Sequence, residues 1–211
     1  MMLTMFLTLL AYILGSIPNA LWIGKIFKKI DVREHGSKNT GSTNAARVLG
    51  VKLGILTLIL DVLKGAIPTY LGVIFGANTL STMTGIDKLD LIVIGLAAIL
   101  GHTFSIFMHF TGGKAVATTL GVFLVLVPYA TLILLVVFVV VFSLTKYVSL
   151  ASVISAIMLP IAVYVTTKHI PLTILGIIIG LLVIVRHKSN IIRLMNGTES
   201  KLVLKKKDDK K

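Results

Sequence analysis

Residues 115–145 read AVATTLGVFLVLVPYATLILLVVFVVVFSLT and hold no charged residue between Lys114 and Lys146. About 20 apolar residues suffice to cross a membrane as an α-helix, and this stretch is considerably longer, with Pro128 near its middle. A proline inside a helix kinks or breaks it. The stretch therefore predicts either one strongly tilted membrane helix or two shorter helices that meet near Pro128.

The composition explains why such stretches belong in a membrane. Of the 211 residues, 56% are apolar and only 14% are charged, and the mean hydropathy is +0.99. A typical soluble domain carries about 25% charged residues, so this chain cannot cover itself with a polar surface. The chain also contains no cysteine, which excludes disulfides, thiolate metal sites and a cysteine-bound acyl intermediate.

The distribution of basic residues decides how often the chain crosses. Lys and Arg accumulate in cytoplasmic loops, so the basic segment 25–38 places the end of the first span in the cytoplasm. Two crossings by 115–145 then bring Lys114, Lys146 and the basic C-terminal segment to that same side, whereas one crossing leaves that segment outside. The other candidate spans are the apolar stretches 3–24, 53–75, 89–110, 147–167 and 170–185.

The sequence thus predicts an all-α integral membrane protein of seven transmembrane helices, with the N-terminus outside and the C-terminus in the cytoplasm. We expect residues 1–199 to form one domain and residues 200–211 to form a polybasic cytoplasmic tail that contacts lipid. Of the 21 basic residues, Lys88 and Lys168 lie outside and Lys64 lies within a span, which leaves 18 in the cytoplasm. This orientation explains the net charge of +13, and no nucleic-acid partner is expected because aromatic residues do not alternate with the basic ones.

The first polar cluster is the cytoplasmic segment 31–44, DVREHGSKNTGSTN. Its glycines permit backbone conformations in which successive amides point inward and bind an anion, and Ser42, Thr43 or Asn44 is expected to cap the following helix. Arg47, one turn later, adds a guanidinium fork for phosphate. The alternative is a polar connector that binds nothing. The candidate phosphate-binding residues are Gly36, Asn39, Gly41, Thr43, Asn44 and Arg47.

Two further clusters lie at expected span ends. In GHTFSIFMHFTGGKAVAT, residues 101–118, we expect Gly112, Gly113 and Lys114 to open a helix and to bind phosphate there, although the Walker A spacing is absent. Three roles are open for His102: a general base, a hydrogen-bond donor to phosphate, or a histidine that is hydrogen-bonded between helices. In RHKSNIIRL, residues 186–194, the spacing places Arg186, Asn190 and Arg193 on one helical face, either as part of a site or as a basic anchor at the membrane surface.

Two observations concern the ionisable residues. Asp61 and Lys64 are three residues apart inside the span 53–75 and are expected to share a face, as an ion pair or as a substrate contact. Glu199 is a lone carboxylate beyond the last cluster. The five histidines do not have the spacing of metal ligands, so we predict neither a metal nor another cofactor.

Taken together, the clusters resemble the bacterial membrane acyl-phosphate:glycerol-3-phosphate acyltransferases. The matching motifs run in order nearly from end to end of the chain and leave only the tail uncovered. Lys38 and Ser42 are small departures within the glycine-rich motif and leave its framework intact. The motifs are GSIP at 15–18, DVREHGSKNTGSTNAAR at 31–47, LDVLKG at 60–65, GHTFSIFMHFTGGKAVAT at 101–118 and RHKSNIIRLMNGTE at 186–199.

The resemblance implies an enzyme of the bacterial cell membrane with seven helices and a cytoplasmic active site. Its substrates would be glycerol 3-phosphate and an acyl phosphate, with membrane lipids around it, and its product 1-acylglycerol 3-phosphate. It implies catalytic roles for Ser37, His187 and Asn190, phosphate binding by the glycine-rich motifs with Arg47 and Lys114, and supporting roles for Asp61, Lys64, His102, Arg186 and Glu199.

The sequence also constrains the chemistry of such an enzyme. Soluble-type glycerophosphate acyltransferases use a histidine followed five residues later by aspartate, and no histidine here has that partner. We therefore hypothesise that a substrate phosphate oxygen accepts the proton of the acceptor hydroxyl, with His187 as the main rival base. The alternatives to this enzyme are a small anion transporter or channel and a membrane acyltransferase with a different acceptor.

Overall fold

The computed structural model describes residues 1–202, and this part of the chain is all-α. Residues 203–211, most of the expected polybasic tail, lie outside the described residues. The described part contains eleven α-helices and one 3₁₀ turn, η1. Their bounds are α1 Met2–Ser16, α2 Asn19–Lys28, α3 Ser42–Leu49, α4 Val51–Ile74, α5 Thr79–Thr84, α6 Leu89–Thr103, η1 Ile106–Met108, α7 Val116–Leu126, α8 Pro128–Thr145, α9 Val148–Thr167, α10 Ile170–Arg186 and α11 Lys188–Met195.

The stretch 115–145 forms two helices, α7 and α8, that meet at Pro128. Val127 leaves the helical conformation, with φ −147° and ψ 70°, and Pro128 occupies the first turn of α8, where its missing N–H would have no partner in any case. The α7 helix has only 11 residues, which is about 16 Å and well short of a bilayer core. The α8 and α9 helices are each long and apolar enough to cross a membrane.

Two expected spans differ from the structure. Residues 3–24 do not form one helix, because the chain bends by 45° between α1 and α2. Pro18 lacks an N–H and holds the preceding Ile17 in an extended conformation, with ψ 117°, so the helix cannot continue. The expected span 89–110 ends already at Thr103, and a loop with the turn η1 follows.

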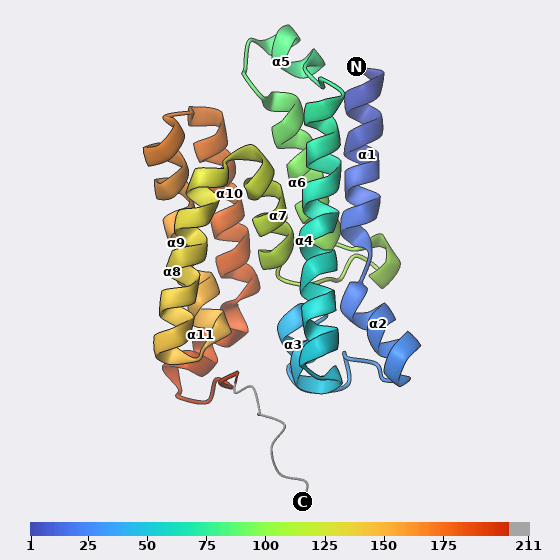
Figure 1. Ribbon diagram of the computed structural model, residues 1–211, viewed down its shortest axis with the longest axis vertical. Helices are drawn as coiled ribbons and strands as arrows, with labels where there is room; N and C mark the ends of the chain where they lie inside the picture. The colour runs from blue at the N-terminus through green and yellow to red at the C-terminus, as the bar shows by residue number, and fades with distance from the viewer. Residues whose placement is uncertain (203–211) are drawn as a thin grey trace, which may run out of the picture.

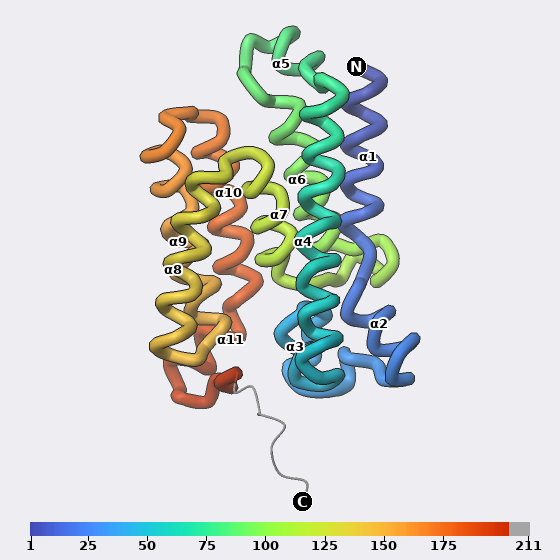
Figure 2. Tube along the Cα trace, viewed as in Figure 1, coloured from blue at the N-terminus to red at the C-terminus, as the bar shows by residue number. Residues whose placement is uncertain are grey.

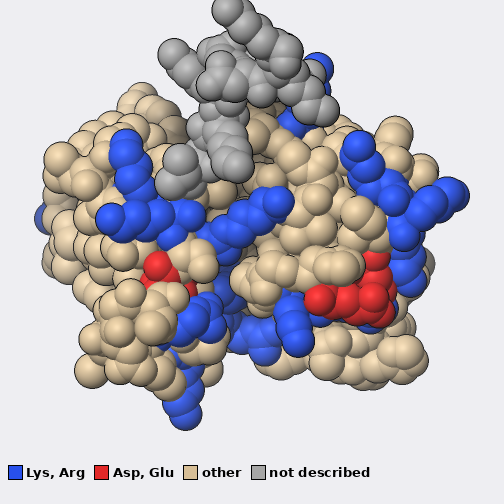
Figure 3. Space-filling model, turned by 90° about the horizontal axis from the view of Figure 1, so that it is seen from below, with Lys and Arg blue, Asp and Glu red and all other residues tan. Residues whose placement is uncertain are grey.

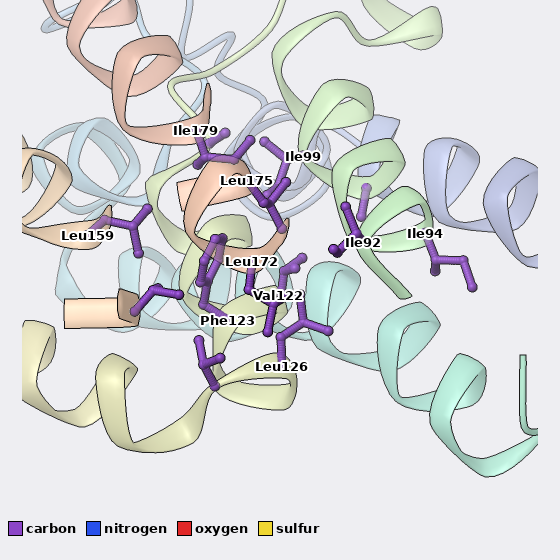
Figure 4. Packing of buried hydrophobic residues seen from close by; sticks show 14 of the residues in the cluster. Ile92, Ile94, Ile99, Val122, Phe123, Leu126, Leu159, Leu172, Leu175 and Ile179 are labelled. Carbon is purple, nitrogen blue, oxygen red and sulfur yellow. The ribbon is translucent and has the colours of Figure 1, made fainter. Parts of the chain in front are cut away.

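The helices pack as two groups, which contact each other where α7 meets α8 and where α6 meets α10 (Figure 1). One group contains α1, α4, α6 and α7, and the other contains α8, α9 and α10. The buried side chains that join them come from α6, α7, α9 and α10 (Figure 4). Small residues allow close contact inside the first group, since a Cβ on Gly121 of α7 would overlap the carbonyl oxygen of Val62 on α4, a mode of packing common among membrane helices.

The two ends of the molecule differ in charge. The N-terminus lies at one end with α5, where the Met1 amino group donates to Thr79 Oγ1 over 2.8 Å. At the opposite end lie α2, α3 and α11 (Figure 2). Figure 3 views this second end, which we call the basic end, and shows Lys and Arg side chains gathered over it.

Candidate active site

A cavity of about 470 Å³ lies between the two helix groups, a volume within the usual range for small-molecule sites. The polar residues that line it come mainly from the segment 37–47, from the start of α7 and from the segment 187–199. Most of the remaining lining is apolar and includes Ile55 and Leu58 of α4, Leu120 and Phe123 of α7, Leu134, Leu135, Phe138 and Phe142 of α8, and Leu159 of α9. One cavity therefore offers both polar and lipid-like surroundings to a ligand.

The glycine-rich segment before α3 is held in place by Asn44. The Asn44 amide donates to the carbonyls of Val32, over 2.8 Å, and of His35, over 3.1 Å, and its Oδ1 accepts from the Ser37 N–H over 2.8 Å. Gly36 takes a positive φ of 60° directly beneath this amide, a conformation that favours glycine. The segment is therefore a fixed loop that presents Ser37 and Asn39 to the cavity.

The prediction that Ser42, Thr43 or Asn44 caps α3 is wrong. Gly41 is the N-cap and no side chain caps the helix, because the Asn44 side chain is already engaged by the loop. The first amides of α3 are thus left without a side-chain acceptor, and they lie beside Thr43, which lines the cavity. Free amides at a helix N-terminus favour an anion.

Two cations line the cavity without a carboxylate partner. Arg47 donates to the carbonyl oxygen of Ser200 over 2.8 Å, and Lys114 donates to Oδ1 of Asn190. Within residues 1–202, neither cation forms a salt bridge. Burial lowers the pKa of Lys114 to about 8 and also lowers that of Arg47. Their positive charge is therefore available to an anion in the cavity.

Glu199 holds in place the side chains that lie next to these cations. Its Oε1 accepts from Ser149 Oγ and Asn190 Nδ2, and its Oε2 accepts from Arg193 Nε, each over 2.7 Å. Burial opposes its charge, but these hydrogen bonds outweigh burial and lower the pKa of Glu199. Because Asn190 in turn accepts from Lys114, Glu199 positions the cavity cation through Asn190.

The expectation that Arg186 shares a helical face with Asn190 and Arg193 is wrong. The chain bends by 59° between α10 and α11, and His187 stands at the bend, where its Nδ1 bonds the Val183 carbonyl over 2.8 Å. Arg186 remains on α10 and donates to the carbonyls of Gly112, over 2.7 Å, and of Gly113, over 3.2 Å.

The two glycines before Lys114 do not open α7, which begins at Val116. The Gly113 N–H donates to the His102 carbonyl over 3.1 Å, and a Cβ on either glycine would overlap His102. They therefore allow the loop to pack on this histidine, whose Nδ1 bonds Thr118 Oγ1 over 3.1 Å. His102 is thus hydrogen-bonded between helices, which is one of the three roles expected for it.

Asp61 and Lys64 form the expected ion pair inside α4, with 2.9 Å between Asp61 Oδ1 and Lys64 Nζ. Asn19 Nδ2 donates to the same oxygen over 2.9 Å, and Lys64 also donates to the carbonyl of Ile17 over 2.8 Å. Of the two charged residues, Asp61 lines the cavity. The pair therefore joins α4 to the bend between α1 and α2.

The structure brings most of the expected site residues into one cavity. Gly36, Lys64, Gly112, Gly113 and Arg186 do not line it but support residues that do. Sequence reasoning missed the polar residues that α7, α8 and α9 contribute. The serines of α9 recur every third residue in an otherwise apolar span, a spacing that marks one polar helical face. The expected residues that line the cavity are Ser37, Asn39, Gly41, Thr43, Asn44, Arg47, Asp61, His102, Lys114, His187, Asn190 and Glu199, and the missed ones are Thr119 of α7, Thr131 of α8 and Ser149, Ser152 and Ser155 of α9.

The comparisons with known proteins all identify the same family. The model of the family described as glycerol-3-phosphate acyltransferase matches residues 5–197. A glycerol-3-phosphate acyltransferase of Fusobacterium nucleatum is 54% identical over 192 residues, which cover 91% of this chain and 94% of that protein. The chain also resembles the crystal structure of PlsY, an integral membrane glycerol 3-phosphate acyltransferase, in its glycerol 3-phosphate form. That match has 39% identity and a TM-score of 0.85 over 95% of this chain and 96% of the other. The lysophosphatidic acid form of PlsY matches with 38% identity and a TM-score of 0.82 over the same shares.

Proposed function

The chain belongs to the glycerol-3-phosphate acyltransferase family, and we propose that it transfers a fatty acyl group from an acyl phosphate to the sn-1 hydroxyl of glycerol 3-phosphate. The products are 1-acylglycerol 3-phosphate and inorganic phosphate, at an early step of phospholipid biosynthesis. Because the chain belongs to this family of enzymes, the alternative function of a small anion transporter or channel is rejected. The observation that carries the proposal is the pair of cations, Arg47 and Lys114, in a cavity that continues along apolar helix faces.

Both substrates fit the two halves of this cavity. Each carries a phosphate, for which Arg47, Lys114, the free amides of α3 and the side chains of Ser37, Asn39 and Thr43 supply donors. The fatty chain lies along the apolar part between α4, α7, α8 and α9. The relatives crystallised in glycerol 3-phosphate and lysophosphatidic acid forms support glycerol 3-phosphate as the acceptor.

The reaction needs positioning and charge stabilisation more than a covalent intermediate. The acceptor hydroxyl oxygen attacks the acyl carbonyl carbon, and the carbon–oxygen bond to phosphate breaks as the tetrahedral oxyanion collapses. Lys114, held by Asn190, stabilises the negative charge that develops. The hydroxyl proton passes to a substrate phosphate oxygen, since a phosphate monoester has its second pKa near 6.

The choice of acyl donor is tested directly with purified protein. We expect incubation with palmitoyl phosphate and glycerol 3-phosphate to release inorganic phosphate and lysophosphatidate in equal amounts, because phosphate is a competent leaving group. Palmitoyl-CoA should give no product. Carbon NMR of the product should place the acyl group on C1. Comparable turnover with palmitoyl-CoA, or an acyl group on C2, would contradict the proposal.

We further propose that the protein crosses the bacterial plasma membrane seven times, with the basic end and the active site facing the cytoplasm. The seven segments are α1–α2, α4, α6, α7, α8, α9 and α10, of which the 11-residue α7 is shorter than the hydrocarbon core. Two features support this orientation. Basic residues prefer the cytoplasmic side, and Lys88 and Lys168 lie in connections that reach the opposite end, where His169 Nε2 is 3.2 Å from Asp87 Oδ2.

Cysteine labelling tests this topology cleanly, because the chain has no cysteine of its own. In intact spheroplasts, an impermeant maleimide should label Met83→Cys on α5 and should leave Lys38→Cys unlabelled until the membrane is permeabilised. Met83 and Lys38 are both exposed, so burial does not explain a difference. Labelling of Lys38→Cys in intact spheroplasts would overturn the topology and the cytoplasmic site.

A further inference from the structure

The two carboxylate oxygens of Asp61 have different surroundings. Oδ1 accepts from Asn19 Nδ2 and Lys64 Nζ, each over 2.9 Å, and lies 3.8 Å from His102 Nδ1. Oδ2 is buried, and no group within residues 1–202 donates a hydrogen bond to it. The whole residue is 1% exposed, yet it lines the cavity. The protein therefore supplies hydrogen-bond donors to Oδ1 of Asp61. Oδ2 can accept a hydrogen bond only from a molecule that occupies the cavity.

A carboxylate oxygen can only accept hydrogen bonds, and a buried one without a donor is costly. Lys64 and Asn19 donate to Oδ1, and the ammonium of Lys64 balances the charge of the carboxylate. Oδ2 consequently requires a donor from the ligand. Thr119 Oγ1 is a second buried polar atom without a hydrogen-bond partner among the described residues, and Thr119 also lines the cavity.

Only one of the two substrates brings a neutral donor. An acyl phosphate has no hydroxyl, and its negatively charged phosphate is repelled by a carboxylate. Glycerol 3-phosphate has two hydroxyls, and the product keeps the one that is not acylated. We propose that Asp61 is a specificity-determining residue whose Oδ2 accepts a hydrogen bond from the C2 hydroxyl of glycerol 3-phosphate. This inference rests on the proposed function.

The charges of the cavity favour the C2 hydroxyl over the reacting one. The reacting oxygen must lie beside the acyl phosphate, and a carboxylate at that point would repel this phosphate. Arg47 and Lys114 attract the phosphate of the acceptor, whereas Asp61 repels it, so the molecule is oriented with its phosphate toward the cations.

The test compares three acceptors: glycerol 3-phosphate, 3-hydroxypropyl phosphate, which lacks the C2 hydroxyl, and dihydroxyacetone phosphate, which has an acceptor oxygen at C2. We expect the wild type to prefer glycerol 3-phosphate over both by about 10- to 100-fold in kcat/KM. In Asp61→Asn, Lys64 and Asn19 retain the amide oxygen, so the NH₂ group replaces Oδ2. The preference over 3-hydroxypropyl phosphate should then fall below about fivefold, and dihydroxyacetone phosphate should improve relative to glycerol 3-phosphate.

Asn19→Ala is the matched control, because it removes a donor to Oδ1 and leaves Oδ2 unchanged. It should lower thermal stability and keep the wild-type acceptor ratios. If Asp61→Asn does not fold, Asp61→Asn combined with Lys64→Gln removes both charges together and should show the same loss of preference. Wild-type ratios in the folded Asp61 variants, or equal use of glycerol 3-phosphate and 3-hydroxypropyl phosphate by the wild type, would overturn the inference. A wild type that acylates none of the three acceptors would instead contradict the proposed function.

Discussion

Replacing Lys114 and Arg47 together by alanine is expected to lower kcat/KM for glycerol 3-phosphate by about 10²- to 10⁴-fold. Each cation offers a charge-assisted hydrogen bond to phosphate, and losing one such bond costs about 1.5–3 kcal/mol, or about 10- to 100-fold in rate. Lys114 bonds Asn190 and Arg47 bonds the Ser200 carbonyl, so the two share no protein partner. The expected range multiplies the two single effects, and because both cations bind the same phosphate, a departure from it measures the coupling between them.

The same double variant should fold almost normally. Each cation makes a single protein hydrogen bond to a neutral oxygen, and each lines the cavity rather than the helix contacts. Steady-state rates of the detergent-purified protein, together with its thermal unfolding, measure the two effects separately. Lys28→Ala is the control, since Lys28 is an exposed cation of the basic end away from the cavity lining. Wild-type turnover by a well-folded double variant would remove both residues from the site.

The pH dependence provides an independent check on Lys114. Its pKa of about 8, lowered by burial, means that the group is charged below pH 8 and loses its proton as the pH rises through 8. We therefore expect kcat/KM for glycerol 3-phosphate, which reports the free enzyme, to fall above about pH 8. Lys114→Arg should move this decline to higher pH, because a guanidinium keeps its charge. An unchanged decline in that variant would assign it to another group.

The sequence predicted those helix breaks and ion pairs that depend only on residues close together in the chain. Pro128 marks the break between α7 and α8 because a ring without an N–H acts on its own turn. Asp61 and Lys64 pair because three residues separate them on one helix. Pro18 carries the same local signal, but residues 3–24 were interpreted as one helix because their apolar length matches a single span. Apolar length alone therefore does not separate α1 from α2. A proline alone does not decide the matter either, because Pro68 and Pro160 lie inside the continuous helices α4 and α9.

Other features depend on residues that are distant in sequence. The bend at His187 carries no proline or glycine signal, and Glu199 fixes α11 by bonding Ser149 of α9, 50 residues away. Asn44 is expected to cap α3 but bonds the preceding loop, and Arg186 is expected on one face with Asn190 and Arg193 but bonds the loop before Lys114. The motifs indicated which segments contribute to the site. The role of each residue within a motif depends on contacts between helices and could not be predicted from the sequence.

His187→Ala is expected to lower the rate by about 10- to 100-fold, and His187→Gln should recover most of that loss. The Val183 carbonyl can only accept, so Nδ1 of His187 carries the proton of that 2.8 Å hydrogen bond. In the neutral ring Nε2 is then an acceptor, and His187 lines the cavity. We propose that Nε2 accepts the hydrogen bond of the acceptor hydroxyl and aligns it for attack, while the proton leaves to a phosphate oxygen.

The glutamine variant separates this positioning role from general base catalysis. An amide oxygen still accepts a hydrogen bond from the hydroxyl, but it cannot take up a proton at neutral pH. If His187 only positions the hydroxyl, His187→Gln and His187→Asn keep substantial kcat and lose mainly alignment. If His187 is the base, both amide variants should lose about 10²- to 10⁴-fold in kcat, with KM unchanged. A deep loss of that kind would contradict the transfer to phosphate. Because phosphate itself then takes the proton, the rate of the glutamine variant should depend on pH near the second pKa of phosphate, about 6, in addition to the decline above about pH 8 that Lys114 causes.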